Sequence, residues 1–161
     1  MRRQTPREYA DRLRRITPDR LTRAMSGATE RVLRREALPA VRAETLRQGV
    51  VATGQFLDAW RVERDGPGEV SLRNLSPHAG VVEYGRRPGR MPPIGALVRW
   101  VEIRLGKGGP EAIRAAWGIA HRIAQRGTRG RGILRRVRQR LLRRIRQAEL
   151  AAAQKILSGK E

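Results

Sequence analysis

Cysteine is absent from this sequence, and the only aromatic residues are three tryptophans, two tyrosines and one phenylalanine. Without cysteine the chain has no disulfide, no thiol nucleophile and no cysteine ligand for zinc. No stretch approaches the roughly 20 consecutive apolar residues of a membrane helix. The N-terminal charges are not followed by an apolar run, so we expect no secretory signal. These absences predict a folded, soluble, non-secreted protein with no membrane partner.

Acidic residues are also scarce, and positive charge is in large excess. The 161 residues include 36 basic and 15 acidic side chains, which gives a formal net charge of +21 at pH 7. Residues 1–50 carry a net charge of +7, residues 51–100 of +2 and residues 101–161 of +12. The natural partner of such a chain is a polyanion or a strongly acidic protein surface.

Residues 1–50 have the periodicity of amphipathic helices. Thr5 to Glu8 have the pattern of a capping box, in which the threonine is the N-cap and the glutamate reaches back. A second helix is expected to start at Thr17, and Pro39 should kink or break it. We predict two or three helices in this segment.

Residues 51–126 mix strand and helix patterns. Residues 57–64 and 69–75 alternate between apolar and polar side chains, and the turn-forming residues 65–68 separate them. This pattern predicts a β-hairpin with a loop of about four residues. Residues 77–85 are compatible with one or two helical turns that end at a glycine.

Two further helices are expected in this middle segment, over residues 93–105 and from Pro110 to about residue 123. We expect Val82, Tyr84, Trp100 and Trp117 to fasten helices to the small sheet. The predicted apolar faces comprise Leu97, Trp100, Val101 and Leu105 in the first helix and Ile113, Trp117, Ala120 and Ile123 in the second.

Residues 127–161 begin with the glycine-rich stretch 127–132, which we expect to be a flexible break, and continue as one long helix from about residue 133 to residue 157. The apolar positions of that helix recur at spacings of three and four, close to a heptad, and arginine fills the opposite face. The stripe packs either on the N-terminal helices of the same chain or on another subunit. It comprises Leu134, Val137, Leu141, Ile145, Ala148, Ala152 and Ile156.

The patterns together predict an α+β protein. It has N-terminal amphipathic helices, a central β-hairpin or small antiparallel sheet, and C-terminal helices that include the long arginine-rich one. We expect the three segments, residues 1–50, 51–126 and 127–161, to form one structural unit.

No constellation of residues predicts catalysis. His78 and His121 lack the spacing of a metal site, and no Gly-x-Ser-x-Gly elbow is present. We therefore expect no enzyme, no metal and no cofactor.

The segment from Arg122 to Arg146 contains eleven arginines and no acid. One interpretation is contact with nucleic-acid phosphates or an acidic partner, because the guanidinium fork suits phosphate and carboxylate alike. The other is a solvated helix face whose arginines follow the codon use of a GC-rich genome. Interleaved aromatic residues are absent from the segment, which argues against base stacking. The candidate contact residues are Arg122, Arg126, Arg129, Arg131, Arg135, Arg138, Arg143 and Arg144.

Five short motifs follow one another in residues 53–136. They are Thr53-Gly54-x-x-Leu57-x-x-x-Trp60-x-Val62, Asn74-x-x-Pro77-His78-Ala79-x-x-Val82-Glu83-Tyr84-Gly85, Arg87-Pro88-Gly89-x-Met91-Pro92-Pro93, Leu97-Val98-Arg99-Trp100 and the stretch from Ala120 to Thr128. Their order resembles the tail-component family of long-tailed bacteriophages, the neck or tail-completion group related to minor tail protein Z of lambda-like phages. The chain departs from that family at Ala59, His78 and Gly132-Ile133-Leu134, where the family often has Ser, Tyr and Pro-Phe-Leu.

The resemblance implies a structural protein of the virion, located at the head–tail junction and assembled in the host cytoplasm. Its copies are expected to form a ring, hexameric to match a tail tube, that completes the tail and joins it to the head. The implied partners are the tail terminator or tail tube, the head-side connector or portal, and genomic DNA without sequence specificity. The alternative function is a sequence-independent, basic nucleic-acid-binding protein, and a nuclease-like enzyme is a weaker third interpretation.

Residues 86–93 are expected to form an extended interface loop, because three prolines exclude a helix there. Its charge comes from Arg86, Arg87 and Arg90, which we expect at a contact with a neighbouring subunit or protein. Glu83 precedes these arginines, so it either pairs with one of them or makes a contact between subunits.

Overall fold

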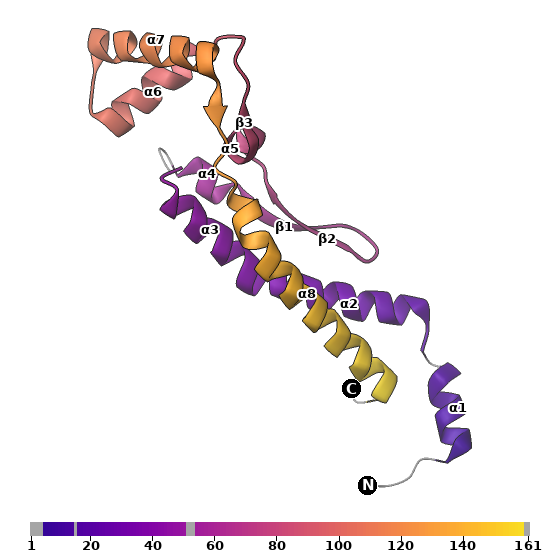
Figure 1. The fold of residues 1–161 in the computed structure, drawn as a ribbon. Coiled ribbons are helices and arrows are strands. Elements are labelled where there is room, and N and C mark those ends of the chain that lie inside the picture. The colour runs from indigo at the N-terminus through magenta and orange to yellow at the C-terminus, as the bar shows by residue number, and fades with distance from the viewer. Residues whose placement is uncertain (1–4, 15, 51–53, 160–161) are drawn as a thin grey trace. The chain divides into compact units, whose positions relative to one another are not determined.

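The computed structural model describes residues 5–14, 16–50 and 54–159 and contains helices and short antiparallel strands (Figure 1). The predicted α+β class is therefore confirmed. Thr53, the first residue of the sequence motifs, lies outside the described residues. In chain order the elements are α1 (Pro6–Arg14), α2 (Pro18–Val32), η1 (Leu33–Ala37), α3 (Leu38–Arg47), α4 (Gln55–Asp58), β1 (Trp60–Gly66), β2 (Glu69–Asn74), α5 (Ala79–Tyr84), β3 (Gly85–Arg86), α6 (Ile94–Leu105), α7 (Gly109–Arg126), β4 (Thr128–Arg129) and α8 (Ile133–Ser158).

The chain folds into two compact units, each assembled from separate stretches of the sequence. Unit 1 comprises residues 1–40, 61–73 and 137–161, and unit 2 comprises residues 41–60 and 74–136. Each unit has an apolar cluster of its own. The two units are described separately below.

Both predicted helix starts in the N-terminal segment are confirmed. The backbone N–H of Thr5 donates to Glu8 Oε2 at 2.8 Å, and the N–H of Glu8 donates to Thr5 Oγ1 at 3.3 Å. Thr17 Oγ1 accepts the N–H of Arg20 at 3.3 Å, and the proline that follows Thr17 opens α2. These bonds satisfy backbone donors that a helix start leaves without partners.

Pro39, which was expected to kink or break the helix, does not break it. The turn before it, η1, is a π-helix in which the N–H of Leu38 donates to the carbonyl of Leu33, five residues back. A proline in an α-helix has no N–H to donate, and its ring meets the carbonyl four residues back. The wider π turn relieves that clash, so the helix continues into α3.

The core of unit 1 lies where α8 contacts η1 and the β1–β2 hairpin. Its buried residues are Leu33, Ala37, Val62 and Leu141, and Val137 and Ile145 of α8 pack on them with Leu38, Val70 and Leu72. Three members of the predicted α8 stripe thus pack on the same chain rather than on another subunit.

The predicted hairpin exists, with two corrections. Residues 57 and 58 belong to the short helix α4, which follows Gly54 at a φ of 79°, so β1 begins only at Trp60. The connection between β1 and β2 consists of two residues, Pro67 and Gly68, instead of about four. Gly68 has a φ of 83°, a conformation that glycine adopts without steric cost, and it allows the tighter turn.

In unit 2, α6 and α7 form a helical hairpin (Figure 1). Alanine side chains of α7 pack against α6. Ala112, Ala116 and Ala120 recur every four residues on α7 and are each 0% exposed. The prediction of an Ile113–Trp117 face in the core was wrong, because these side chains are 47% and 46% exposed. Small side chains let the two helix backbones approach closely, so the larger residues are left outside.

The predicted apolar face of α6 was also only partly correct. Val101 is buried, and Ile94, Leu97 and Val98 pack around it. Trp100 and Leu105 are exposed instead, and so is Tyr84 of α5. The expectation that Tyr84, Trp100 and Trp117 fasten helices to a sheet is therefore wrong.

Residues 127–132 are more ordered than the predicted flexible break. Thr128 and Arg129 form β4, which pairs antiparallel with β3, so that Gly85 faces Arg129 and Arg86 faces Thr128. The pairing brings the end of α7 beside the end of α5. The rest of the predicted extended loop before α6 has no regular structure, as expected.

Candidate functional site

The end of α3 is held in place by a tryptophan from β1. Trp60 is buried, and its indole N–H donates to Thr45 Oγ1 at 3.1 Å. The Thr45 hydroxyl donates in turn to the carbonyl of Val41 at 2.7 Å. These bonds satisfy the polar side-chain groups of Trp60 and Thr45, and they position the last turn of α3, which carries Glu44 and is followed by Gln48.

Glu83 of α5 caps the N-terminus of α8. Its two carboxylate oxygens accept the backbone N–H groups of Leu134 and Arg135 at 3.0 and 3.1 Å. A negative group at a helix N-terminus satisfies free donors and interacts favourably with the helix dipole. The structure gives Glu83 this backbone contact instead of the expected ion pair with the arginines that follow it. The alternative, a contact between subunits, stays a prediction.

Glycines let the chain pass close to the end of α5. A Cβ atom on Gly130 would lie 2.4 Å from the carbonyl oxygen of Glu83. One on Gly85 would lie 2.3 Å from the carbonyl oxygen of Thr128, and one on Gly127 would lie 2.0 Å from that of Arg86. Such distances exclude any side chain, so the backbone of residues 127–130 packs on the backbone of residues 83–86. We call this contact the crossover.

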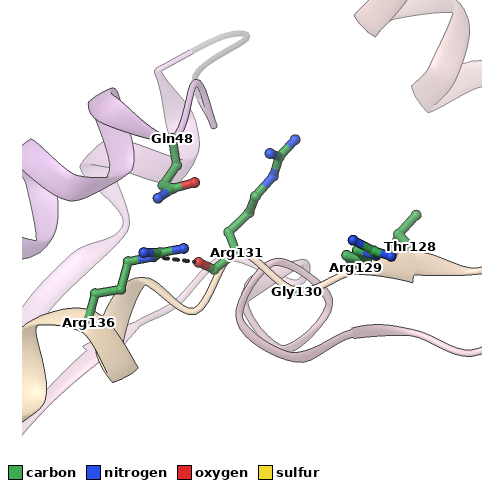
Figure 2. A pocket seen from close by; sticks show the side chains of 6 residues that line it. All are labelled: Gln48, Thr128, Arg129, Gly130, Arg131 and Arg136. Carbon is green, nitrogen blue, oxygen red and sulfur yellow. Dashed lines mark hydrogen bonds between the residues drawn. The ribbon is translucent and has the colours of Figure 1, made fainter.

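Beside the crossover lies an open hollow of about 450 Å³, which we call the basic hollow. Figure 2 shows the guanidinium groups of Arg129, Arg131 and Arg136 around it, together with Gln48. The hollow is lined by Gln48, Thr128, Arg129, Gly130, Arg131 and Arg136. It therefore combines residues from the turn after α3, from β4, from the following connection and from the first turn of α8.

One nearly buried carboxylate organises the cations on the α3 side of the hollow. Glu44 accepts hydrogen bonds from Arg47 at 2.7 and 2.8 Å and from Gln48 at 2.8 Å. Arg136 lies 3.4 Å from the same carboxylate, and its Nε donates to the carbonyl of Arg131 at 3.3 Å. The hydrogen bonds from Arg47 and Gln48 lower the pKa of Glu44, so this carboxylate is ionised at neutral pH.

The structure gathers only some of the arginines predicted to contact a polyanion. Arg129 and Arg131 share the basic hollow, whereas Arg122 and Arg126 are exposed along α7. Arg135 lines a second, smaller hollow of about 230 Å³ with Glu83, Tyr84 and Gly130.

The remaining predicted arginines belong to unit 1. Arg138 and Arg143 are exposed on α8. Arg144 already has an acidic partner, because its two nitrogens lie 2.9 Å from the two carboxylate oxygens of Glu36. That ion pair lowers the pKa of Glu36 and raises the pKa of Arg144.

The predicted interface loop is fixed at two points. The Arg86 guanidinium donates to the carbonyl of Arg90, and the N–H of Gly89 donates to the carbonyl of Ala124 in α7 at 2.8 Å. Arg87 and Arg90 are exposed. The interface role of the loop stays a prediction.

Five polar side chains at or beside this site were not among the predicted site residues: Glu44, Arg47, Gln48, Thr128 and Arg136. Arg136 lies within the arginine run, but nothing in the run distinguishes it from its neighbours. Glu44 and Gln48 are four residues apart, a spacing that brings side chains together on a helix and could have indicated a polar pair. Both residues are far from β4 in the sequence, so spacing alone does not indicate that they lie near it.

Two findings on the described residues concern other kinds of site. None of the helices in residues 5–14, 16–50 and 54–159 combines the length and the apolar character needed to cross a bilayer. In that part of the chain, no group of three or more His, Asp or Glu side chains is placed to hold a metal ion.

Comparison with known proteins adds no relative. No protein-family profile, no curated protein and no solved structure matches this chain.

Proposed function

We propose that this chain is a structural protein of the head–tail junction of a long-tailed bacteriophage. Its copies form a ring that completes the tail and joins it to the connector on the head. The resemblance of residues 53–136 to the tail-component family suggests this function. The structural observation that carries it is the packing of two separate motifs against each other at the crossover.

The two motifs at the crossover are residues 82–85 and residues 126–128, which lie far apart in the sequence. β3 pairs with β4, and the carbonyl of Val82 accepts the N–H of Arg131 at 2.7 Å. Glu83 caps the helix that follows the second motif. Motifs that belong to one family are expected to meet in one structural element, and these two do so.

Exposed apolar side chains on the α6–α7 hairpin support self-association. Ile113 and Trp117 lie one turn apart on α7 and are about half exposed, and Trp100 and Ile103 are 40% exposed on α6. Large aromatic groups outside a core are typical of protein interfaces. We assign these side chains to the contact between neighbouring copies in the ring.

The charge of the chain explains why such a ring needs further partners. Each copy has a formal net charge of +21, so identical copies repel one another. An acidic surface on the tail tube, terminator or portal, or the packaged genome, would offset that repulsion. Ring formation is therefore expected at the junction rather than in dilute solution.

Deletion of the gene tests the function in the phage. We expect filled heads and separate tails to accumulate, because the step that joins them is lost, and electron microscopy counts both. Normal joined particles from the deletion strain would contradict the proposed function.

A pair of variants tests the subunit contact. Changing both Ile113 and Trp117 to Gln should leave folding intact and lower the yield of joined particles at least tenfold, an effect of about 1.4 kcal/mol or more. Leu150→Gln is the matched control, because it removes another exposed apolar side chain outside the α6–α7 hairpin. Equal losses in both variants would show that α6 and α7 do not form the contact.

A second candidate function is sequence-independent binding of nucleic acid by a basic protein. The basic hollow favours it, because three arginines line it.

A further inference from the structure

We propose that the basic hollow binds the phosphodiester backbone of a nucleic acid. This inference deepens the second candidate function by naming its site and its ligand. It does not depend on ring formation, and it holds for a junction protein that touches the genome as well as for a free one.

The local charge of the hollow is strongly positive. Arg129, Arg131 and Arg136 line the hollow, and Arg136 shares the carboxylate of Glu44 with Arg47. Arg129 and Arg131 form no ion pair with an acid in the part of the chain that the structure describes, and both are exposed. An anion in the hollow would relieve the repulsion between these cations and release their counterions.

The polarity of the lining favours phosphate over a protein surface. Every lining residue is an arginine, a threonine, a glutamine or a glycine, and none is apolar. The centre of a protein–protein interface is depleted of charged groups and rich in apolar ones. A polyphosphate backbone needs no apolar anchor, because its affinity comes from charge.

Part of the hollow is already arranged for a ligand. Arg136 is fixed between the carbonyl of Arg131 and the carboxylate of Glu44, so it loses little side-chain freedom on binding. Guanidinium groups in such an arrangement can donate paired hydrogen bonds to phosphate oxygens.

A second feature of the site, an exposed tyrosine, can distinguish a single-stranded ligand from a duplex. Tyr84 is 84% exposed and lines the smaller hollow, which shares Gly130 with the basic hollow. An exposed aromatic ring can stack on a base of a single strand but not on the paired bases of a duplex. Residue type and spacing do not indicate this neighbour, because Tyr84 lies outside the arginine run.

The experiment measures binding of the full chain to labelled oligonucleotides of one length and arbitrary sequence, single-stranded and duplex, over a range of salt. Arg129 and Arg131 are changed together to Gln. We expect duplex affinity at about 0.1 M salt to fall at least tenfold, and the slope of log K against log salt to lose about 2 units. Arg129→Gln alone should show roughly half of the loss in slope, and it tests the site with a single exposed substitution.

The matched control changes Arg99 and Arg114 to Gln, which removes the same charge from exposed positions of α6 and α7. This control should change the duplex affinity and the salt slope much less than the Arg129/Arg131 variant does. Equal losses in the two variants, or no binding by the unaltered chain, would overturn the phosphate site. Competition by poly-glutamate as strong as that by nucleic acid, compared at equal charge, would overturn it as well.

Tyr84→Ala identifies the form of the ligand. A loss of about tenfold with the single strand alone supports a single-stranded ligand. Unchanged binding of both forms supports the duplex backbone, and either result is compatible with phosphates in the hollow. Joined particles are then counted for the Arg129/Arg131 variant, so that a normal count with lost binding separates this site from the junction function.

Discussion

Units 1 and 2 of this protein are held together by different kinds of contact. In unit 1 large aliphatic side chains from α8, η1 and the hairpin fill the core, and ion pairs of Glu30 and Glu36 surround it. In unit 2 alanines join α6 to α7, and glycines let backbone pack on backbone at the crossover.

The difference indicates a division of roles between the units. Unit 1 combines an aliphatic core with ion pairs of Glu30 and Glu36, which suits a scaffold. Unit 2 leaves Trp100, Trp117 and Tyr84 at the surface, and its Arg129 and Arg131 form no ion pair with an acid among the described residues. Partner contacts are therefore expected mainly on unit 2.

The largest effect on stability is expected in the core of unit 1. Leu141 is 8% exposed and packs in the apolar cluster, so Leu141→Ala should lower the free energy of unfolding by about 3 kcal/mol. The neighbouring Leu142 is 50% exposed, and Leu142→Ala should cost under about 1 kcal/mol. Urea unfolding measures both, and similar losses would contradict the assigned face of α8.

The next largest effect is expected at the glycine crossover of unit 2. Gly130→Ala places a Cβ against the backbone of α5, and we expect a cost of about 2 kcal/mol from overpacking. Gly118, inside α7, has open space at its Cβ position, so Gly118→Ala should stabilise the chain by about 0.5–1 kcal/mol. Thermal unfolding should therefore shift in opposite directions, and a shift of the same sign would refute the close packing.

A smaller loss is expected from the cap of α8. Glu83→Ala removes the acceptor of two backbone N–H groups, and we expect a cost of about 1 kcal/mol. Hydrogen exchange at Leu134 and Arg135 should accelerate, because their N–H groups lose their partner. Glu102→Ala, a change of the same kind on the exposed face of α6, is the control and should leave that exchange unaltered.

The smallest effect is the pH dependence of stability that we expect from the ion pairs of unit 1. Hydrogen bonds from Arg34 and Arg64 lower the pKa of Glu30, and those from Arg144 lower the pKa of Glu36. A lowered pKa in the folded state contributes stability above the unfolded pKa, and that contribution is lost as the pH falls through the folded value.

We therefore expect the urea midpoint to fall as the pH drops below the ordinary glutamate range. In the variant with both Glu30 and Glu36 changed to Gln, the midpoint should depend less on pH. An identical pH dependence in the variant and the unaltered chain would show that these pairs contribute nothing measurable, as is common for surface pairs.

The sequence predicted the contacts of unit 1 better than those of unit 2. The caps at Thr5 and Thr17 and the α8 stripe follow from residue type and spacing, because large apolar side chains mark the buried face there. On α7 the same rule selected Ile113 and Trp117, although the buried face consists of alanine. Alanine is common on both faces of helices, so its spacing carries little information.

The candidate site was predictable only in part. The run of arginines was evident, and Arg129 and Arg131 were among the residues singled out from it. Their assembly into a hollow depends on the pairing of β3 with β4 and on Glu83 as a cap, which are contacts between distant residues. Pro39 gives a similar lesson, because the π turn that accommodates it is a matter of backbone geometry that residue type alone does not indicate.

The central claim is that copies of this chain form a ring at a phage head–tail junction, and a reconstruction of that junction from purified particles tests it most directly. The account predicts a ring of identical copies in which Ile113 and Trp117 lie at the contact between neighbours. It also predicts that the basic hollow faces the DNA. A junction whose density is filled by other proteins, with no ring of this chain, would contradict the account.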